Sequence, residues 1–367
     1  MPIGSGVETL RLLPSVPYVI DPASFAAMTT ENVAPLTPIA APGSSQRVSY
    51  QLPDADVVAR LRINFDGQVV VSNANQTPSF AWPYGLIANF TLTANGISHD
   101  LWNLSGNDIF ELNFVDHPGR FSNSDVFPGG LGGGTAIVPG IYPLHLSWSI
   151  PIAVDDAWLV AALFAQSSQT LLNGSILQEN TQNLLAAGGN VADFTISGSF
   201  TITETSYEIP IDNNGRMILP DVTKLHQVVA IYEPWTNTGA NPVTLLRTAG
   251  QLMRVFVSGT SAFNTPLSAA PGTALTGAID EIDLMYGLRA TPYVWAPASV
   301  LAKTNELDYG ALVPLDTVVI DQMARNPVRD MILLQGVTNL RANIVIDSAV
   351  VPTVGQANLR CVEEILI

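Results

Sequence analysis

The sequence predicts an all-β protein in which an extended N-terminal arm precedes two consecutive β-sandwiches. Three observations lead to this prediction: prolines crowd the first 45 residues, strand-like runs alternate with turn signals from Val48 onward, and helical patterns are confined to two short stretches. We expect the arm over residues 1–45, the first sandwich over 46–205 and the second over 206–367. Each sandwich has room for eight strands of about six residues plus loops, which is the size of a jelly roll. The alternation by itself is compatible with other sandwich topologies too.

The N-terminal segment 1–45 differs in composition from the rest of the chain. Its prolines block both helices and central strands, so we expect an extended segment. Its apolar residues are too frequent for a solvated linker, and Arg11 is its only basic residue. Two interpretations stay open: the arm lies on its own domain, or it reaches a neighbouring subunit. The seven prolines of the arm are Pro2, Pro14, Pro17, Pro22, Pro35, Pro38 and Pro42.

In the first sandwich, two long runs have the pattern of hairpins. Val57–Val71 carries the turn dipeptide Asp66–Gly67 near its middle, and Leu86–Leu104 carries Asn95–Gly96. A later run, FTISGSFTITETSYEI, alternates apolar and hydroxyl residues, as expected for a half-buried strand. The further strands expected here are Tyr142–Ile152, Thr170–Ile176 and Phe194–Ile209.

The second sandwich shows the same alternation of strand-like runs and turn signals. Three segments of the chain, two of them in the first sandwich, depart from this alternation. Asp155–Asp156 precedes the run AWLVAALFA, and acidic residues ahead of a helix-forming run predict a short helix. Thr317–Arg325 is a second helix candidate. The glycine-rich segment Pro128–Gly134 is expected to form a mobile loop tip. The strands expected in the second sandwich are Gln227–Tyr232, Leu252–Ser258, Val328–Leu334, Arg341–Ile346 and Leu359–Ile367.

The chain is acidic and poor in charged residues. Of its 367 residues 13% are charged and 47% are hydrophobic, and the formal net charge is −16 at pH 7. Much of the surface must therefore be neutral, a composition that suits a protein packed against copies of itself. Lys224 and Lys303 are the only lysines and no basic run occurs, so the sequence argues against direct nucleic-acid binding, which depends on phosphate contacts.

Cysteine content and hydropathy argue against proteins with disulfides or CxxC sites and against membrane-spanning proteins. Cys361 is the only cysteine, so the chain forms no intrachain disulfide and contains no CxxC metal or redox pair. A large chain without disulfides fits assembly in a reducing cytosol. The N-terminus lacks the regions of a signal peptide, and no apolar run approaches the ~20 residues of a membrane-spanning helix.

Three near-motifs come close to known chemistry without matching it. Gly259–Phe263 resembles the nucleophile elbow GxSxG around Ser261, but phenylalanine replaces the final glycine that the strained turn needs. Asp212–Gly215 resembles the start of a calcium loop, but its glycine comes too early, so we expect a β-turn. Asp280–Asp283 offers paired carboxylates, yet solvated acids at a strand end explain it as well.

The histidines do not point to a metal site. They are widely separated and show neither HxH nor HExxH spacing. His145 lies within the strand-like run LHLSWSI, where we expect it to pack rather than to bind a metal. The sequence therefore predicts no catalytic, cofactor-binding or metal-binding residues and no cofactor. The four histidines are His99, His117, His145 and His226.

Two stretches of the chain resemble a known family. Glu204–Pro210 (ETSYEIP) is followed by Asn214–Pro220 (NGRMILP) and by the leucine-bearing turn Asp221–Leu225. Ser149–Ala153 (SIPIA) precedes a short helical run. In this order the motifs resemble those of the double jelly-roll major capsid proteins of tailless icosahedral double-stranded DNA phages with an internal membrane, the tectivirus-like group. The resemblance covers the chain after the arm.

The resemblance implies two eight-stranded jelly rolls standing side by side, with short helices in loops. It implies a structural major capsid protein, not an enzyme, that forms a homotrimer of pseudo-hexagonal outline and tiles an icosahedral virion shell with neighbouring trimers. Minor or vertex proteins and an internal membrane are further implied partners. The implied location is the virion capsid, assembled in the host cytoplasm. Relatives often carry basic residues where the N-terminal segment approaches the membrane; Arg11 alone argues against that contact here.

A different class stays open, a β-sandwich module of a phage tail or spike that binds or degrades a host glycan. Exposed aromatic residues clustered on one face would support this hypothesis, because sugars stack on aromatic rings, and buried ones would oppose it. A jelly-roll enzyme of the cupin type is a third candidate, disfavoured because histidine and glutamate ligands have no recognisable spacing. The aromatic residues in question are Trp82, Tyr84, Trp102, Trp148, Trp158, Trp235 and Trp295.

Overall fold

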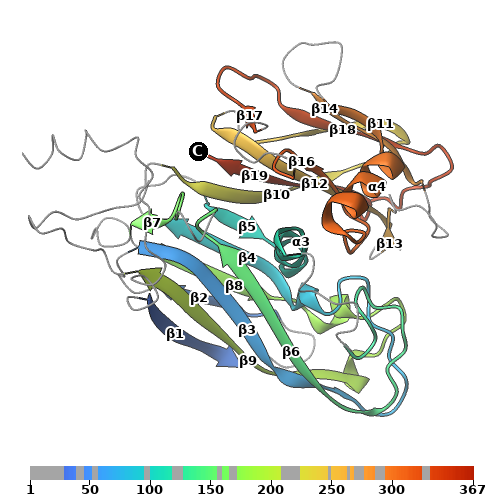
Figure 1. Cartoon of the computed structure of the whole chain (residues 1–367). Helices are drawn as coiled ribbons and strands as arrows, with labels where there is room; N and C mark the ends of the chain where they lie inside the picture. Colours follow the sequence, from blue (N-terminus) through green and yellow to red (C-terminus); the bar gives the residue numbers. More distant parts are fainter. Residues whose placement is uncertain are drawn as a thin grey trace, which may run out of the picture.

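The computed structural model shows two β-lobes that follow one another along the chain (Figure 1). The lobe coloured blue to green comes from the first half of the sequence, and the lobe coloured yellow to red comes from the second half. The structure describes residues 29–38, 45–51, 57–94, 100–117, 127–154, 159–164, 172–207, 224–246, 249–262, 265–267, 277–285, 294–324 and 331–367.

The first lobe is a sandwich of two sheets. Its main strands are β1 (Thr29–Pro38), β2 (Arg47–Gln51), β3 (Val57–Val71), β4 (Ile87–Ala94), β5 (Trp102–Leu104), β6 (Gly140–Pro151), β8 (Leu172–Gln178) and β9 (Phe194–Tyr207). Counted along the chain, the first, eighth, third and sixth of these strands form one sheet, β1-β9-β3-β6. The second, seventh, fourth and fifth form the other, β2-β8-β4-β5. The short strand β7 (Leu163–Phe164) pairs with the start of β3.

The second lobe repeats this strand order. Its main strands are β10 (His226–Pro234), β11 (Gly239–Thr244), β12 (Gln251–Ala262), β14 (Ile279–Met285), β15 (Val294–Pro297), β16 (Val318–Asp321), β18 (Arg341–Ile346) and β19 (Asn358–Leu366). They form the sheets β10-β19-β12-β16 and β11-β18-β14-β15, while the short strands β13 (Thr265–Pro266) and β17 (Ile332–Leu333) pair with β12. We call β1-β9-β3-β6 and β10-β19-β12-β16 the 1-8-3-6 sheets. This order is that of a jelly roll, so the structure decides the topology that the alternation left open.

The two lobes are joined through their sheets. Val228 and Val229 of β10 pair in parallel with Trp102 and Asn103 of β5, so a sheet of the first lobe continues into the 1-8-3-6 sheet of the second. Each lobe also has its own apolar core between its sheets. The first core includes Trp102, Trp148 and Phe200, and the second includes Val255, Ile282 and Ile344.

One predicted hairpin is wrong, because Val57–Val71 is a single strand. Asp66 and Gly67 lie inside it, where β6 and β9 pair with β3 on both sides. Gly67 is paired with Gly198 of β9, and a Cβ on Gly67 would lie 2.2 Å from the carbonyl oxygen of Ser197. The glycine therefore permits a close approach of two strands instead of a turn, and pairing on both sides outweighs the local turn preference.

Most other predicted strands are confirmed. The hairpin within 86–104 is formed by antiparallel β4 and β5, and its expected turn at 95–96 lies outside the described residues. Strands β6, β8, β9, β10, β12, β18 and β19 fall on predicted runs, and β17 occupies the described end of the run 328–334. The sequence patterns did not predict β11, β14 and β15, whose short runs contain Pro, Gly or acidic residues that are rare in strands.

Part of the predicted arm belongs to the first lobe. Residues 29–38 form β1, which pairs with β9 at the edge of the 1-8-3-6 sheet, so the arm does not extend to residue 45 as expected. Prolines are tolerated there because an edge strand has a pairing partner on one side only, and the register shifts between Pro35 and Pro38. This stretch lies on its own lobe. The remaining arm residues, 1–28 and 39–44, lie outside the described part of the chain.

The two predicted helices are wrong, and helices occur elsewhere. The residues after 158 form a turn, with positive φ at Leu159 and Ala161, that leads into β7, while 155–158 lie outside the described residues. Within Thr317–Arg325, the four residues of β16 pair with β12. In the described residues the α-helices are α3 (Gly106–Asp116) and α4 (Ala298–Tyr309), which directly follow the fifth strand of each lobe, and the 3-10 helices are η1 (Tyr84–Leu86), η2 (Thr181–Leu184) and η3 (Val191–Asp193). None of these described helices is long and apolar enough to span a membrane.

The glycine-rich loop Pro128–Gly134 is packed against the first lobe instead of forming a mobile tip. Trp82 donates its indole N–H to the carbonyl oxygen of Pro128 at 2.7 Å, and the N–H of Gly132 donates to the carbonyl oxygen of Trp82 at 2.8 Å. Gly133 has a positive φ, and a Cβ there would lie 2.1 Å from the carbonyl oxygen of Ser79. The glycines therefore let this loop approach the neighbouring backbone closely.

Candidate functional site: the junction between the lobes

A group of buried charges lies where α3 meets the 1-8-3-6 sheet of the second lobe. Figure 1 shows α3 between the two lobes. A capping box starts the helix: the hydroxyl of Ser105 accepts from the N–H of Asp108, and the carboxylate of Asp108 accepts from the N–H of Ser105. Asp108, Glu111 and Asp116 face the second lobe, where they meet arginines on β19 and β12.

Arg360 of β19 forms the first half of this junction. Its Nη1 lies 3.1 Å from Oδ1 of Asp108, and its Nη2 donates to Oε2 of Glu111. The hydroxyl of Tyr232 donates to Asp108 at 3.3 Å. Both carboxylates are buried and belong to the first lobe, whereas Arg360 belongs to the second. A single arginine therefore contacts two carboxylates across the junction and leaves one negative charge in excess when both are ionised.

Arg254 of β12 forms the second half. Its Nη1 lies 2.6 Å from Oδ1 of Asp116 and 3.2 Å from Oε2 of Glu364, and its Nε lies 3.3 Å from Oδ2 of Asp321. His226 lies 3.0 Å from Glu364 through Nε2 and 2.7 Å from the carbonyl oxygen of residue 151 through Nδ1. Three carboxylates thus converge on Arg254, and Asp116 is the one that the first lobe contributes.

Burial raises the pKa of these carboxyl groups, and the neighbouring arginines lower it. Burial raises the pKa of Glu111 to about 7, although Arg360 lowers it in part. The pKa of Asp116 is also raised, first by desolvation and then by the neighbouring charge of Glu364. Burial alone would raise the pKa of Glu364, but Arg254 and the hydrogen bond from the adjacent imidazole outweigh it, so that pKa is lowered. The junction thus holds Glu364 ionised and binds protons readily at Glu111.

Apolar side chains complete the junction. Four residues of the second lobe's 1-8-3-6 sheet belong to the apolar cluster of the first lobe and are buried in it. Because residues paired side by side in a sheet share a face, these four lie on the face that carries Arg254 and Arg360. The junction is therefore a continuous packed contact with charges embedded in it. The four residues are Val228, Phe256, Val319 and Val362.

Sequence patterns missed this junction, although one signal was present. Arg254 and Arg360 stand inside apolar strand runs, MRVFV and NLRCV, and a charge in such a run is seldom buried unless it is paired. The pattern does not reveal the partners. Those lie on α3, a helix whose capping box Ser105–Asp108 was the readable signal for its start.

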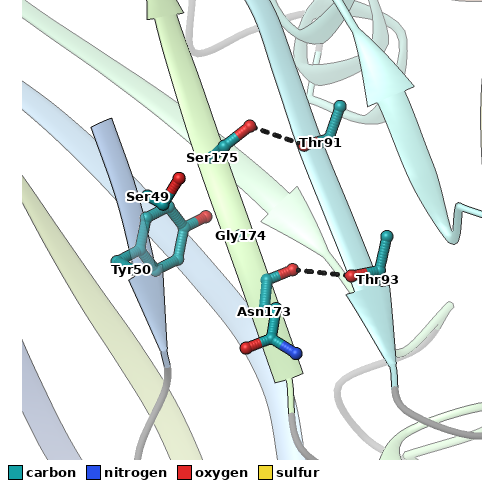
Figure 2. A pocket seen from close by; sticks show the side chains of 7 residues that line it. All are labelled: Ser49, Tyr50, Thr91, Thr93, Asn173, Gly174 and Ser175. Carbon is teal, nitrogen blue, oxygen red and sulfur yellow. Dashed lines mark hydrogen bonds between the residues drawn. The ribbon is translucent and has the colours of Figure 1, made fainter. Parts of the chain in front are cut away.

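A shallow hollow of about 420 Å³ lies on the first lobe beside β2, β8 and β4 (Figure 2). The hydroxyls of Thr91 and Ser175 are 2.8 Å apart, and Arg47 donates to Ser175 at 2.8 Å. Thr93 donates to the carbonyl oxygen of Asn173 at 3.2 Å. Thr91 and Ser175 thus bond to each other, whereas Thr93 bonds to the backbone. The hollow therefore offers hydrogen bonds but brings together no general base or set of metal ligands among its lining residues.

The residues of the three near-motifs do not form a catalytic or metal-binding site within the described part of the chain. Ser261 lies within strand β12, not at a strand-to-helix turn. Asp280 is exposed, whereas Asp283 is buried on the same strand and accepts a hydrogen bond from Asn343 at 3.2 Å. The calcium-like segment 212–215 lies outside the described residues. Within the described part of the chain, no group of three or more His, Cys, Asp or Glu side chains is arranged to hold a metal.

The histidines have separate structural environments. His145 does not pack in the core as expected: it is exposed and lies 2.7 Å from Asp66 on the neighbouring strand. His226 is buried in the junction, and His117 directly follows α3. His99 lies outside the described residues.

The aromatic residues that a glycan-binding module would expose are buried. Trp82, Trp102 and Trp148 are fully buried, and Tyr84 and Trp235 are nearly so. Trp158 lies outside the described residues, as does the side chain of Trp295. Burial opposes the glycan hypothesis, because a stacking platform needs an exposed ring face.

Comparisons with known proteins bear on the fold. No sequence family and no curated protein matches this sequence. The crystal structure of the major capsid protein of Sulfolobus turreted icosahedral virus matches with a TM-score of 0.65 and 18% identity, covering 92% of this chain and 97% of that chain. The VP54 protein of PBCV-1 matches with a TM-score of 0.61 and 9% identity, covering 92% and 93%. These neighbours are double jelly-roll major capsid proteins of viruses, and the predicted double jelly-roll fold is confirmed.

Proposed function

We propose that this chain is the major capsid protein of an icosahedral virus, and that its role is structural. The observation that supports this most directly is the match of both lobes, in one continuous chain, to almost the full length of a viral major capsid protein. The low content of charged residues suits a surface that is largely covered by copies of itself. The buried charges of the junction act to fix one lobe against the other.

In this proposal three chains form a trimer whose six jelly rolls give a pseudo-hexagonal outline. Such trimers tile the facets of a shell, and minor or vertex proteins and an internal membrane are the further partners. With two lysines and a net charge of −16, the chain contacts no nucleic acid directly. Its place is the virion capsid of a bacteriophage, after assembly in the host cytoplasm.

The proposal includes no catalytic role and a division of the chain into two folding units. Support for the first part is that Ser261 lies within a strand and that Asp283 is engaged by Asn343 in a hydrogen bond. We place the division, predicted at 205–206, between Tyr207 at the end of β9 and His226 at the start of β10. The first unit then begins with β1.

The mass of the purified chain in solution tests this function. Size exclusion with light scattering is expected to give three times 39.1 kDa, about 117 kDa, and negative-stain images are expected to show hexagonal outlines. A stable monomer of 39.1 kDa at every concentration and ionic strength would contradict the capsid proposal.

A further inference from the structure

In each lobe an α-helix follows the fifth strand. Equivalent positions of these two strand–helix units are separated by the same number of residues. β5 begins at Trp102 and β15 at Val294, while α3 begins at Gly106 and α4 at Ala298. Both spacings are 192 residues, from 294 − 102 and from 298 − 106. Positions in the first lobe can therefore be matched to positions in the second by adding 192 in this region.

A pair of hydrogen bonds that occurs in both lobes confirms that the two helices are equivalent. Asn113 of α3 donates to the carbonyl oxygen of Ser149 at 2.5 Å, and its own oxygen accepts from the N–H of Ser149 at 2.8 Å. Asn305 of α4 makes the same pair of bonds with Val319, both at 2.8 Å. Asn113 and Asn305 are again 192 residues apart. In each lobe a helix asparagine thus occupies the free edge of the sixth strand.

The two helices differ in what covers their outer face. The face of α3 packs on the second lobe, whereas the same face of α4 is open to solvent and carries apolar side chains. Asp108, Glu111 and Val115 of α3 are 2%, 0% and 5% exposed, while their equivalents Val300 and Leu307 of α4 are 53% and 77% exposed and the side chain of Lys303 is 58% exposed.

Two strand edges show the same difference. β15 and β1 each end a sheet, so one side of each strand is unpaired among the described residues. Their equivalents inside the chain, β5 and β10, pair with each other in parallel. The chain therefore contains one completed junction between its lobes. The two halves of a second junction lie apart, one on each lobe.

We propose that α4 and β15 bind the first lobe of a second copy of this chain, so that the junction inside each chain is repeated between chains. The receiving surface is the outer face of the partner's 1-8-3-6 sheet, with β15 pairing along β1. This inference rests on the proposed function and gives it a contact surface. Because the contact joins two different surfaces, it continues from copy to copy and closes into a ring when the rotation per copy permits.

The register of the sheets identifies the residues expected to meet. In the second lobe Arg254 pairs with Asp321, two residues beyond Val319, and in the first lobe Arg60 pairs with Pro151, two residues beyond Ser149. Arg60 therefore occupies the place of Arg254. Asp308 of α4, which is exposed, stands 192 residues after Asp116. We expect Asp308 to approach Arg60 of the next copy as Asp116 approaches Arg254 within the chain.

The same register aligns the strand edges. Glu31 of β1, Thr205 and Arg60 are paired in a row, as Val228, Glu364 and Arg254 are in the second lobe. Val228 pairs with Trp102, and Val294 is the equivalent of Trp102. Glu31 of one copy is therefore expected beside Val294 of the next.

The first experiment changes the face of α4. Leu307→Glu places a charge on a side chain that is already exposed, so the lobe should fold normally. We expect the apparent association constant of the trimer, from light scattering across a dilution series, to fall about tenfold or more. Leu333→Glu, on β17, is the matched control at another exposed leucine (59%) and should leave association unchanged.

The second experiment uses cross-linking and does not depend on weakened binding. The double variant Glu31→Cys/Val294→Cys should form covalent trimers on a denaturing gel after mild oxidation. A mixture of the two single variants should stop at cross-linked dimers, and each single variant alone should give none. The native Cys361 is fully buried and does not compete.

The outcomes separate this inference from the proposed function. A wild-type trimer that Leu307→Glu leaves intact, with no cross-link in the double variant, would overturn the α4–β15 surface while the capsid role stands. A wild-type chain that never associates would overturn both. Cross-linked trimers together with a selective effect of Leu307→Glu would establish the surface.

Discussion

Glu111 combines complete burial with a charge that its surroundings only half neutralise. Its pKa is raised to about 7 from 4.5, so the folded chain holds a proton there more tightly than the unfolded chain does. The stabilisation from this proton is fully present below pH 4.5 and is lost as pH rises towards 7. Through this residue the free energy of unfolding should fall by up to about 3 kcal/mol across that window.

Glu111→Gln should flatten this pH dependence, because the amide keeps the shape of the side chain but does not titrate. The measurement is urea unfolding at several pH values between 4.5 and 7.5 for wild type and variant. Glu306→Gln, at a more exposed acid on α4, is the control and should keep the wild-type slope. An unchanged slope in Glu111→Gln would contradict the assignment of this proton to Glu111.

At the scale of elements, β1 divides the predicted arm into two parts with different roles. Removing residues 1–28 leaves β1 in place, so the first lobe should keep its urea midpoint. Removing residues 1–40 also removes β1 and uncovers the edge of β9 along its pairing from Thr29 to Pro38. We expect that longer deletion to cost a few kcal/mol of unfolding free energy and to prevent trimer formation.

Both deletions can be compared by urea unfolding and light scattering. If residues 1–28 tie neighbouring trimers together, the shorter deletion should form trimers that assemble poorly into shells. Equal stability of the two deletion variants would mean that β1 contributes nothing to the lobe, against the pairing observed.

At the scale of the whole molecule, the junction should make the two lobes unfold together. Arg360→Met leaves Asp108 and Glu111 buried without their cation, which should cost about 3–5 kcal/mol. Because these contacts lie between the lobes, calorimetry should change from one transition in the wild type to two in the variant. Arg341→Met, which removes a cation from β18 in the second lobe's other sheet, is the control. A single transition in both variants would show that the apolar part of the junction alone couples the lobes.

How far the sequence predicts this molecule depends on where the deciding contacts lie. Alternation along β9 is local, so that strand could be predicted with nearly correct bounds. The Asp66–Gly67 signal failed because β6 and β9, which are distant in sequence, pair across it.

The junction itself could not be predicted, because its partners are separated by a large part of the chain. Arg360 meets Glu111, 249 residues earlier, and Arg254 meets Asp116, 138 residues earlier. No local pattern contains such a pairing. The family resemblance supplied the jelly-roll topology of the two lobes and their side-by-side placement, but not these contacts.

The hydrogen bonds of Asn113 on α3 show which backbone groups of β6 lie on its unpaired edge. Both side-chain bonds of Asn113 go to the backbone of Ser149, on the side of β6 away from β3. In an antiparallel strand every second residue directs its backbone groups to the same side. Ile141, His145 and Ser147 therefore also direct their N–H groups away from β3. Among the described residues this stretch has no further strand beside it. An open ladder of this kind is a template for amyloid-like stacking. Pro143 stands in the middle of it and removes one donor, so the chain carries its own safeguard against that form of precipitation during storage in concentrated solution.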